Sequence, residues 1–424
     1  QFGNFNPQLG DGRAHLLGEL LDDHDKRWDL QLKGSGTSAF SRGGDGRCAL
    51  GPAIREFIMS EAMYALGVPT TQCLAVTTTG EEVYRQQPTP GAVVTRVASS
   101  HIRVGNFQYF AARGDTDSLK SLADYTIERH FPAIETLHAE QADKQRYIAL
   151  LDQAIEKQIT LVVAWLRVGF IHGVMNTDNT SISGETIDFG PCAMLGNYNP
   201  RTTFSSIDQQ GRYAFGNQAN IAHWNMTRFA ECLLPLLDAE NAGDETQIDA
   251  QQLQKIQALI DDFPKRFQAA YLTMMAGKLG LQGTESSDEH KVLIDDLLQQ
   301  LNIRNLDYTI TFDQLTKSLN CKQTQAQLSK QLGEVFDRWF ALATQPSNGA
   351  ENNQALMRRH NPCVIPRNHH LEKTLKTSEE TGSNHAALAL LSVLRQPYEE
   401  SENTATYQGA DDHYDSDYQT FCGT

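Results

Sequence analysis

The chain has 424 residues and carries 36 lysines and arginines against 52 aspartates and glutamates, so its formal net charge is −16. At about 150 residues per domain, this length predicts two or three domains, or one large two-lobed unit. The acidic surplus argues against sequence-independent nucleic-acid binding, which needs cations to neutralise phosphates, and against docking on anionic membranes. No apolar run approaches the roughly 18–20 residues that span a bilayer.

The first 115 residues are expected to form a small β-rich unit. Three segments have the composition or alternation of strands: 28–33, 74–78 and 93–97. An apolar stripe over residues 54–66 predicts a helix, with Pro52 in its first turn and Gly67 and Pro69 ending it. The opening residues look like the middle of a domain, so this unit is expected to be incomplete at its N-terminus.

From about residue 116 onward the pattern is mainly helical. Helices are expected at 151–168, 219–238, 251–277, 290–301, 325–343 and 385–395. Residues 345–384 are polar and broken by Pro and Asn, and the acidic tail from Pro397 is expected to be irregular. A small β-rich lobe should therefore precede a larger helical lobe.

The tetrapeptide Gly-Asp-Gly-Arg occurs at residues 10–13 and again at 44–47. Glycine lets backbone N–H groups approach an anion closely, and arginine offers phosphate a planar fork. A single copy would be an ordinary turn. Two copies, one on each side of a strand ending at Lys33, favour a phosphate site. The nearby Gly34-Ser-Gly36 is not a Walker loop, because no Gly-Lys-Ser/Thr follows.

Further charged residues follow these loops. Lys33 ends a strand and Glu56 lies 23 residues later on the predicted helix, the order of the ion pair that holds phosphates in kinase folds. Arg96 and Arg103 could clamp additional phosphate charge, although solvated arginines are the simpler interpretation. The pocket formed by these cations is expected to be locally basic.

The segment 172–190 has the frame of a kinase catalytic loop, with His172 first and Asn179 last, followed by a literal Asp-Phe-Gly at 188–190. Gly184 predicts a hairpin between these motifs, which would bring Asn179 and Asp188 to one point. An amide oxygen and a carboxylate suit Mg²⁺.

The catalytic aspartate of the kinase frame is missing, because Val174 stands in its place and cannot accept a proton. The spare acid is Asp178, next to Asn179. The sequence therefore predicts a kinase-like fold with altered chemistry.

Long stretches of the chain resemble the selenoprotein O (SelO) family, and the similarity covers nearly the whole sequence. The matching stretches are 8–13, 32–36, 41–47, 54–57, 67–71, 96–103, 172–179, 211–213, 361–362 and 366–368. Members of this family are pseudokinase-fold enzymes that transfer AMP, rather than phosphate, to protein hydroxyls. The resemblance implies an α+β, two-lobed protein-kinase-like fold, with an N-lobe over 1–115, a helical C-lobe over 116–345 and a C-terminal helical extension and tail over 346–424.

The resemblance also implies roles for individual residues. Nucleotide contacts would come from Gly10, Gly12, Arg13, Lys33, Asp45, Gly46, Arg96, Arg103 and Asp188. Glu56 would pair with Lys33, and Asp178 would be the proton acceptor. Asn179 and Asp188 would hold Mg²⁺, with Mn²⁺ as the alternative. ATP would bind flipped relative to a kinase, so that its α-phosphate faces the acceptor.

The seven cysteines contain no C-x-x-C pair, which argues against a zinc ribbon and favours reduced thiols. Family members carry Cys or selenocysteine third from the C-terminus, the place of Cys422, and in some members it forms a disulfide near the activation segment. The resemblance thus implies a redox pair of Cys192 and Cys422. The chain departs from the family at residues 51–53, where Gly-Pro-Ala replaces the usual Arg-Ser-Ser, so the start of the helix bearing Glu56 is expected to differ.

The expected function is a protein adenylyltransferase that transfers AMP from ATP to Ser, Thr or Tyr hydroxyls and releases pyrophosphate. Its partners would be protein substrates, without nucleic acid or membrane, and a monomer is expected. Its location would be the cytoplasm in a bacterium or the mitochondrion in a eukaryote. Two alternatives remain: a protein kinase acting at the γ-phosphate, and a non-catalytic nucleotide-binding or redox-responsive scaffold, which Val174 favours.

Overall fold

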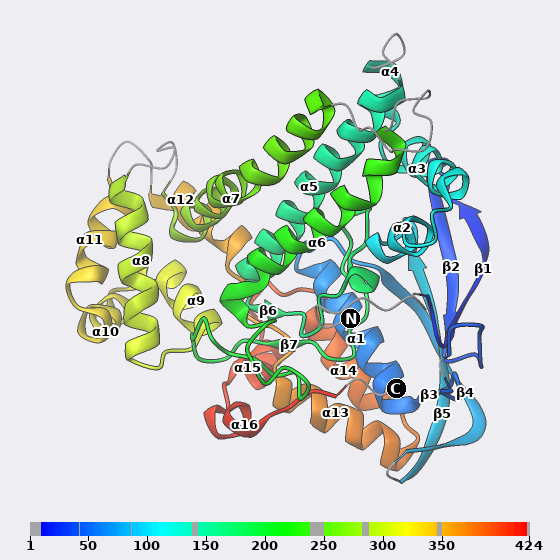
Figure 1. Cartoon of the computed structure of the whole chain (residues 1–424). Helices are drawn as coiled ribbons and strands as arrows, with labels where there is room; N and C mark the ends of the chain where they lie inside the picture. Colours follow the sequence, from blue (N-terminus) through cyan, green and yellow to red (C-terminus); the bar gives the residue numbers. More distant parts are fainter. Residues whose placement is uncertain are drawn as a thin grey trace.

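A β-rich region at the N-terminal end adjoins a mostly helical remainder (Figure 1). This arrangement confirms the expected order of a small β-rich part and a larger helical part. The computed structural model describes residues 10–41, 43–85, 87–137, 143–237, 250–281, 288–345 and 350–421.

The N-terminal sheet is antiparallel and is organised around one long strand, β5. Its strands are β1 (Ala14–Leu21), β2 (Arg27–Lys33), β3 (Cys48–Ala49), β4 (Gln72–Tyr84) and β5 (Pro88–Ala98). β4 pairs with one edge of β5, while β2 and β3 pair with different parts of the other edge, and β1 extends the sheet beyond β2. All three predicted strands are confirmed, within β2, β4 and β5.

The more buried face of β2 is its polar face. Asp29, Gln31 and Lys33 are buried, whereas the alternating apolar residues Trp28, Leu30 and Leu32 are only half-buried. Polar groups are tolerated in such a position when they are hydrogen-bonded. The alternation therefore predicted the strand correctly. The buried face of this strand, however, is the one that carries the polar side chains.

Helix α1 (Leu50–Ala65) packs against β4 and β5. It begins four residues before the apolar stripe, and Pro52 lies in its first turn as predicted, where a missing N–H removes no helical hydrogen bond. The Gly51 backbone N–H in the same turn donates to Glu379 Oε1 at 2.8 Å. A residue more than 300 positions away thus caps the start of this helix.

The helical remainder accounts for most of the chain. Its elements are α2 (Val104–Ala111), α3 (Thr116–His130), α4 (Pro132–Leu137), α5 (Asp143–Val168), β6 (Phe170–Ile171), β7 (Ala193–Met194), α6 (Gln218–Leu233), α7 (Ala250–Leu279), α8 (Asp288–Ile303), α9 (Tyr308–Ser318), α10 (Lys322–Leu332), α11 (Glu334–Ala343), α12 (Ala350–His360), α13 (Asn368–Thr381), α14 (His385–Leu394), α15 (Glu402–Gln408) and α16 (Asp412–Asp417). Within the described ranges, no helix combines the length and apolarity needed to cross a membrane.

Three predictions about the C-terminal half are wrong. The single helix expected over 325–343 is two helices, because Gly333 adopts a positive φ of 61° between α10 and α11. The polar stretch 345–384 contains α12 and α13, and Pro362 and Pro366 lie in the short connection between these two helices. The acidic tail forms α15 and α16, each opened by a capping side chain, from Ser401 and Asp411.

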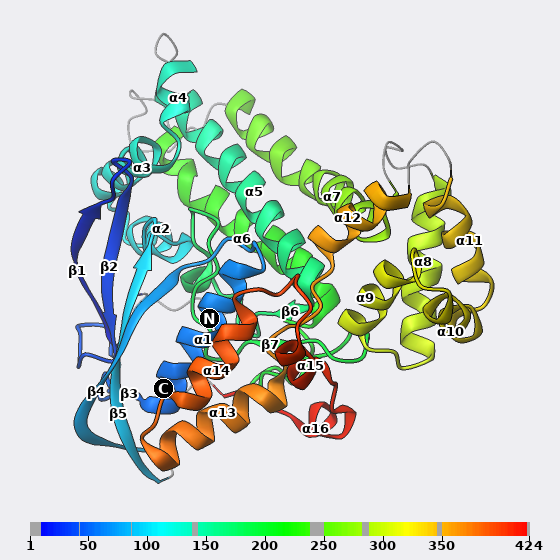
Figure 2. The ribbon, with the colours of Figure 1, turned by 180° about the vertical axis from the view of Figure 1, so that it is seen from behind.

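The interior has two hydrophobic clusters. The larger one joins α1 and the sheet to α3, α5 and α6, and it also includes apolar residues of α13 and α14. The second lies among the end of α7 and helices α8 to α11. Figures 1 and 2 show α13 and α14 lying beside α1, in agreement with their direct contacts. The C-terminal helices therefore belong to the packing of the N-terminal region.

We expect Phe229→Ala to lower the free energy of unfolding by about 3–5 kcal/mol, because it empties a fully buried site. Phe229 packs edge-to-face on Phe107, with ring centroids 4.8 Å apart, and so joins α6 to α2. Urea denaturation would measure the loss. Leu253→Ala, at a position 45% exposed on α7, should change stability by less than about 0.5 kcal/mol; equal effects would contradict this account of the core.

Candidate active site

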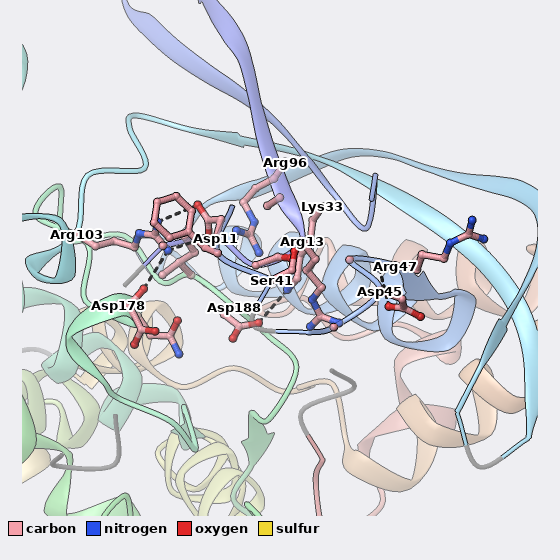
Figure 3. A pocket seen from close by; sticks show the side chains of 18 of the residues that line it. Asp11, Arg13, Lys33, Ser41, Asp45, Arg47, Arg96, Arg103, Asp178 and Asp188 are labelled. Carbon is pink, nitrogen blue, oxygen red and sulfur yellow. Dashed lines mark hydrogen bonds and ion pairs between the residues drawn. The ribbon is translucent and has the colours of Figure 1, made fainter. Parts of the chain in front are cut away.

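A cavity of about 420 Å³ opens where the glycine loops, the sheet and the segment after β6 meet (Figure 3). Its lining includes Gly10, Gly12, Arg13, Lys33, Asp45, Gly46, Arg96, Arg103, Asp178, Asn179 and Asp188. These are the residues expected to contact nucleotide, metal or the transferred proton. Of the expected set only Glu56 does not line this cavity, and it contacts Lys33 directly.

Backbone hydrogen bonds tie both glycine loops to the short segment that follows β2. The Gly34 N–H donates to the Arg13 carbonyl at 2.6 Å, and the Gly36 N–H donates to the Gly46 carbonyl at 3.1 Å. Gly46 has a φ of +69°, and a Cβ there would lie 2.0 Å from the Gly36 carbonyl oxygen. Glycine is therefore required at this position by packing as well as by backbone conformation.

A buried ionic network forms the inner wall of the cavity. Glu56 accepts from Lys33 Nζ at 2.5 Å through Oε2 and from Arg96 Nε at 2.8 Å through Oε1. Lys33 Nζ also donates to Asp188 Oδ1 at 2.9 Å. One carboxylate on α1 thus fixes cations from β2 and β5, and Lys33 joins it to the Asp-Phe-Gly segment. The predicted Lys33–Glu56 pair is confirmed as a contact.

The charges of this network sustain one another. Burial alone would lower the pKa of Lys33, but the Asp188 and Glu56 carboxylates outweigh it and raise that pKa above its ordinary value. Burial would raise the pKa of Asp188, but Lys33 and the arginines Arg13 and Arg96 hold it well below its usual range. All these groups therefore remain ionised near neutral pH.

Asp11 is a site residue that the sequence analysis did not identify. Its carboxylate accepts two bonds from Arg103, Nη1–Oδ1 at 3.0 Å and Nη2–Oδ2 at 2.8 Å, and a third from Gln31 at 3.0 Å. Burial opposes its ionisation, yet Arg103 and Arg96 keep the pKa of Asp11 low. The only available signal was its position inside the Gly-Asp-Gly-Arg motif.

Arg103 joins the first glycine loop to the segment that contains Asp178. Besides pairing with Asp11, its Nη1 donates to the Asp178 carbonyl oxygen at 3.2 Å. Figure 3 shows Asp178 close to this guanidinium at one end of the cavity. Arg103 is therefore held between two loops.

The second Gly-Asp-Gly-Arg copy has different surroundings. Asp45 pairs with Arg85, with Nη1–Oδ2 at 2.7 Å, and this bond is the main cause that lowers the pKa of Asp45 to about 2. Arg47 pairs with Glu81. Both pairs are solvent-exposed, so this copy forms the rim of the cavity rather than its buried wall.

The hairpin expected around Gly184 does not form as paired strands, and this prediction is wrong. Ser181 forms a bridge with Arg103, and Thr186 forms one with Thr70, so the two arms pair with different segments. Between the two arms the chain makes a turn, in which the Gly184 N–H donates to the Ser181 carbonyl oxygen at 3.1 Å. The two arms nevertheless bring the metal-site candidates at 179 and 188 into one cavity, as expected.

Asp188 has an unusual backbone conformation, with a φ of +67°. A residue other than glycine in this region carries strain of about 1–3 kcal/mol, which the surroundings must hold. His172 is fully buried, and burial lowers its pKa, so its neutral ring can donate from Nε2 to the Ile187 carbonyl at 2.9 Å. Phe189 packs in the core against Phe170, with centroids 6.2 Å apart.

Asn179 and Asp188 fit a magnesium ion that binds together with phosphates. Asn179 donates its amide nitrogen to the Val174 carbonyl at 3.0 Å, so its amide oxygen is the atom suited to a cation. Across the described part of the chain, no cluster of three or more His, Cys, Asp or Glu side chains could hold a metal. A cation here would therefore need phosphate or water oxygens to complete its coordination.

The expected redox pair stays a prediction. Cys192 is buried, and burial raises the pKa of its thiol to about 12. Cys422 lies outside the described residues.

The cavity gathers arginines and a lysine beside the carboxylates of Asp178 and Asp188, an arrangement suited to an enzyme that acts on a nucleotide. The family model described as "Protein adenylyltransferase SelO" matches residues 1–395. The chain belongs to this family, which confirms the resemblance and the enzyme class.

Individual relatives agree with this assignment. A protein named "Protein nucleotidyltransferase YdiU" from Teredinibacter turnerae is 53% identical over 424 residues, which is 100% of this chain and 84% of the relative. Proteins of the same name from Pseudoalteromonas translucida and Brevibacillus brevis are 52% and 48% identical, again over 100% of this chain and over 85% and 83% of the relatives. None of these three is named as a protein kinase.

We expect Glu56→Gln to destabilise the protein by about 3–5 kcal/mol, because it leaves buried cations without their carboxylate. The pKa of Glu56 lies below its ordinary value of 4.5, since Arg96 and Lys33 outweigh the effect of burial. Its contribution is therefore complete above pH 4.5 and is lost as the pH falls through the lowered folded-state value.

Urea denaturation of wild type and Glu56→Gln at several pH values would test this expectation. The stability difference between the two proteins should be constant near neutral pH and should shrink below pH 4.5. Glu128→Gln, at an exposed position on α3, serves as the control. A difference that grows as the pH falls would refute the assignment.

Proposed function

We propose that this chain binds ATP in the cavity and transfers its AMP moiety to a Ser, Thr or Tyr hydroxyl of a protein substrate, releasing pyrophosphate. The observation that carries the proposal is the ionic network in which buried Lys33, Glu56 and Arg96 join the half-buried Asp188, with Asp178 lining the same cavity. Membership of a family of protein adenylyltransferases supports the same chemistry.

In this proposal the cations hold the triphosphate. Lys33 and Arg96 are kept charged and oriented by Glu56, and Arg13 lines the same cavity. Arg103 needs little rearrangement, because Asp11 and the catalytic segment already fix it. Mg²⁺, held by Asn179 and Asp188 when bound, would neutralise charge that builds on the phosphates. Positioning and electrostatics would then supply most of the acceleration.

The transfer itself is a displacement at the α-phosphorus. The acceptor hydroxyl oxygen forms a new bond to phosphorus as the bond to the bridging oxygen of pyrophosphate breaks. Asp178 takes the hydroxyl proton, a role that Val174 cannot fill at the kinase position. The fold we propose is the two-lobed kinase-like one, with lobes over 1–115 and 116–345 and an extension over 346–424.

ATP labelled at the α-phosphate should transfer its label to protein, whereas ATP labelled at the γ-phosphate should not. Incubation of the purified chain with cell extract, followed by gel separation, would show which label is retained. Protein labelled only from the γ position would contradict AMP transfer and would favour a kinase. Labelling from neither position would favour a nucleotide-binding scaffold.

Asp178→Ala should lower α-label incorporation by about 10²–10⁴-fold if its carboxylate accepts the proton, while nucleotide binding should be nearly unchanged. Asp188→Ala should weaken both labelling and magnesium-dependent nucleotide binding, because it removes the proposed metal ligand. Asp412→Ala, at an exposed position on α16, is the matched control. Wild-type labelling by Asp178→Ala would exclude its proposed role.

A further inference from the structure

Arg55 is a buried arginine that the chemistry above leaves without a role, although it directly precedes Glu56 in α1. Its side chain is only 6% exposed. Its Nε donates to the Phe189 carbonyl oxygen at 3.3 Å, and its Nη2 donates to the Cys192 carbonyl oxygen. One side chain of α1 therefore binds the backbone at two points in the segment that follows Asp188.

The remaining nitrogen of Arg55 faces the C-terminal part of the chain. Nη1 donates to Glu372 Oε1 on α13 at 2.7 Å and to the Tyr418 hydroxyl at 3.1 Å. Tyr418 in turn donates to the same Glu372 oxygen at 2.6 Å. All three guanidinium nitrogens are thus engaged. Two residues beyond Tyr418, Thr420 Oγ1 donates to the Pro191 carbonyl at 2.6 Å.

These contacts matter because Asp188 is held with a positive φ. The carbonyl groups on both sides of it accept from buried side chains. His172 donates to Ile187 at 2.9 Å, and Arg55 donates to Phe189 at 3.3 Å. A residue in a strained backbone conformation keeps it only where contacts of the neighbouring groups hold it in place. Arg55 makes such a contact on the C-terminal side of Asp188, at the Phe189 carbonyl.

We propose that Arg55 is a positioning residue for Asp188, which ties the Asp-Phe-Gly segment to the helix that carries Glu56. In this way the two carboxylates that bind Lys33 are fixed in one mutual geometry. This inference rests on the proposed function to the extent that Asp188 helps to hold Mg²⁺ with the nucleotide. Lysine cannot replace Arg55, because a single ammonium group lacks the planar fork that reaches several acceptors.

The test is Arg55→Lys in the full chain, assayed by the binding of a non-hydrolysable ATP analogue at increasing Mg²⁺ concentration. We expect the Mg²⁺ concentration for half-maximal binding to rise by about tenfold, the range found when partners of metal ligands are changed. Analogue affinity in EDTA should change less than twofold. Amide hydrogen exchange at residues 187–193, without nucleotide, should become faster.

Glu61→Gln is the matched control, because Glu61 lies on the same helix but pairs at 2.8 Å with Arg395, the residue that follows α14. It should leave the Mg²⁺ dependence and the exchange of residues 187–193 unchanged. A wild-type Mg²⁺ dependence in Arg55→Lys, or an equal shift in Glu61→Gln, would overturn the proposal.

If Arg55→Lys is unstable, Tyr418→Phe provides a second test. This substitution removes the hydroxyl that accepts a hydrogen bond from Arg55 Nη1. We expect a smaller shift in the same direction, at least about twofold, and an unchanged Mg²⁺ dependence would count against the proposal. The binding and exchange assays require no catalysis. Failure of the α-phosphate label to enter protein would therefore reject AMP transfer without deciding the role of Arg55.

Discussion

The buried carboxylate of Glu56 is the interaction on which the rest of the site depends. It forms ion pairs with Lys33 from β2 and Arg96 from β5, and Lys33 also forms an ion pair with Asp188. Cations taken out of water are costly unless they are paired and hydrogen-bonded. The expectation of a simply basic pocket is therefore incomplete, because carboxylates already compensate its cations. In the function that we propose, the triphosphate shares Lys33 with these carboxylates.

Segments far apart in sequence converge on the helix that carries this carboxylate. At the start of α1, the N–H of Gly51 is capped by Glu379. In the middle of this helix, Arg55 binds Glu372 on α13 and Tyr418 in the C-terminal tail. Further along the same helix, Glu61 pairs with Arg395. The C-terminal helices thus help to support the wall of the cavity. This explains why a tail that looks irregular and acidic in sequence is folded.

Two identical tetrapeptides have different roles in the folded chain. In the first copy, the half-buried Asp11 pairs with Arg103 and forms part of the cavity wall. In the second copy, Asp45 binds Arg85 at the exposed rim. The difference arises from their neighbours, because the first copy leads into β1 and lies beside Arg103, whereas the second precedes the short strand β3.

The sequence by itself determined the β-rich and helical parts, the strand ending at Lys33 and the helix bearing Glu56, because periodicity is local. Short motifs and the family resemblance also indicated most of the charged residues of the cavity. Only the tertiary structure decided that the polar face of β2 is buried, that Asp11 fixes Arg103, that the arms around Gly184 pair with separate segments, and that the C-terminal tail reaches Arg55. These features depend on contacts between distant residues, whose partners no local pattern specifies.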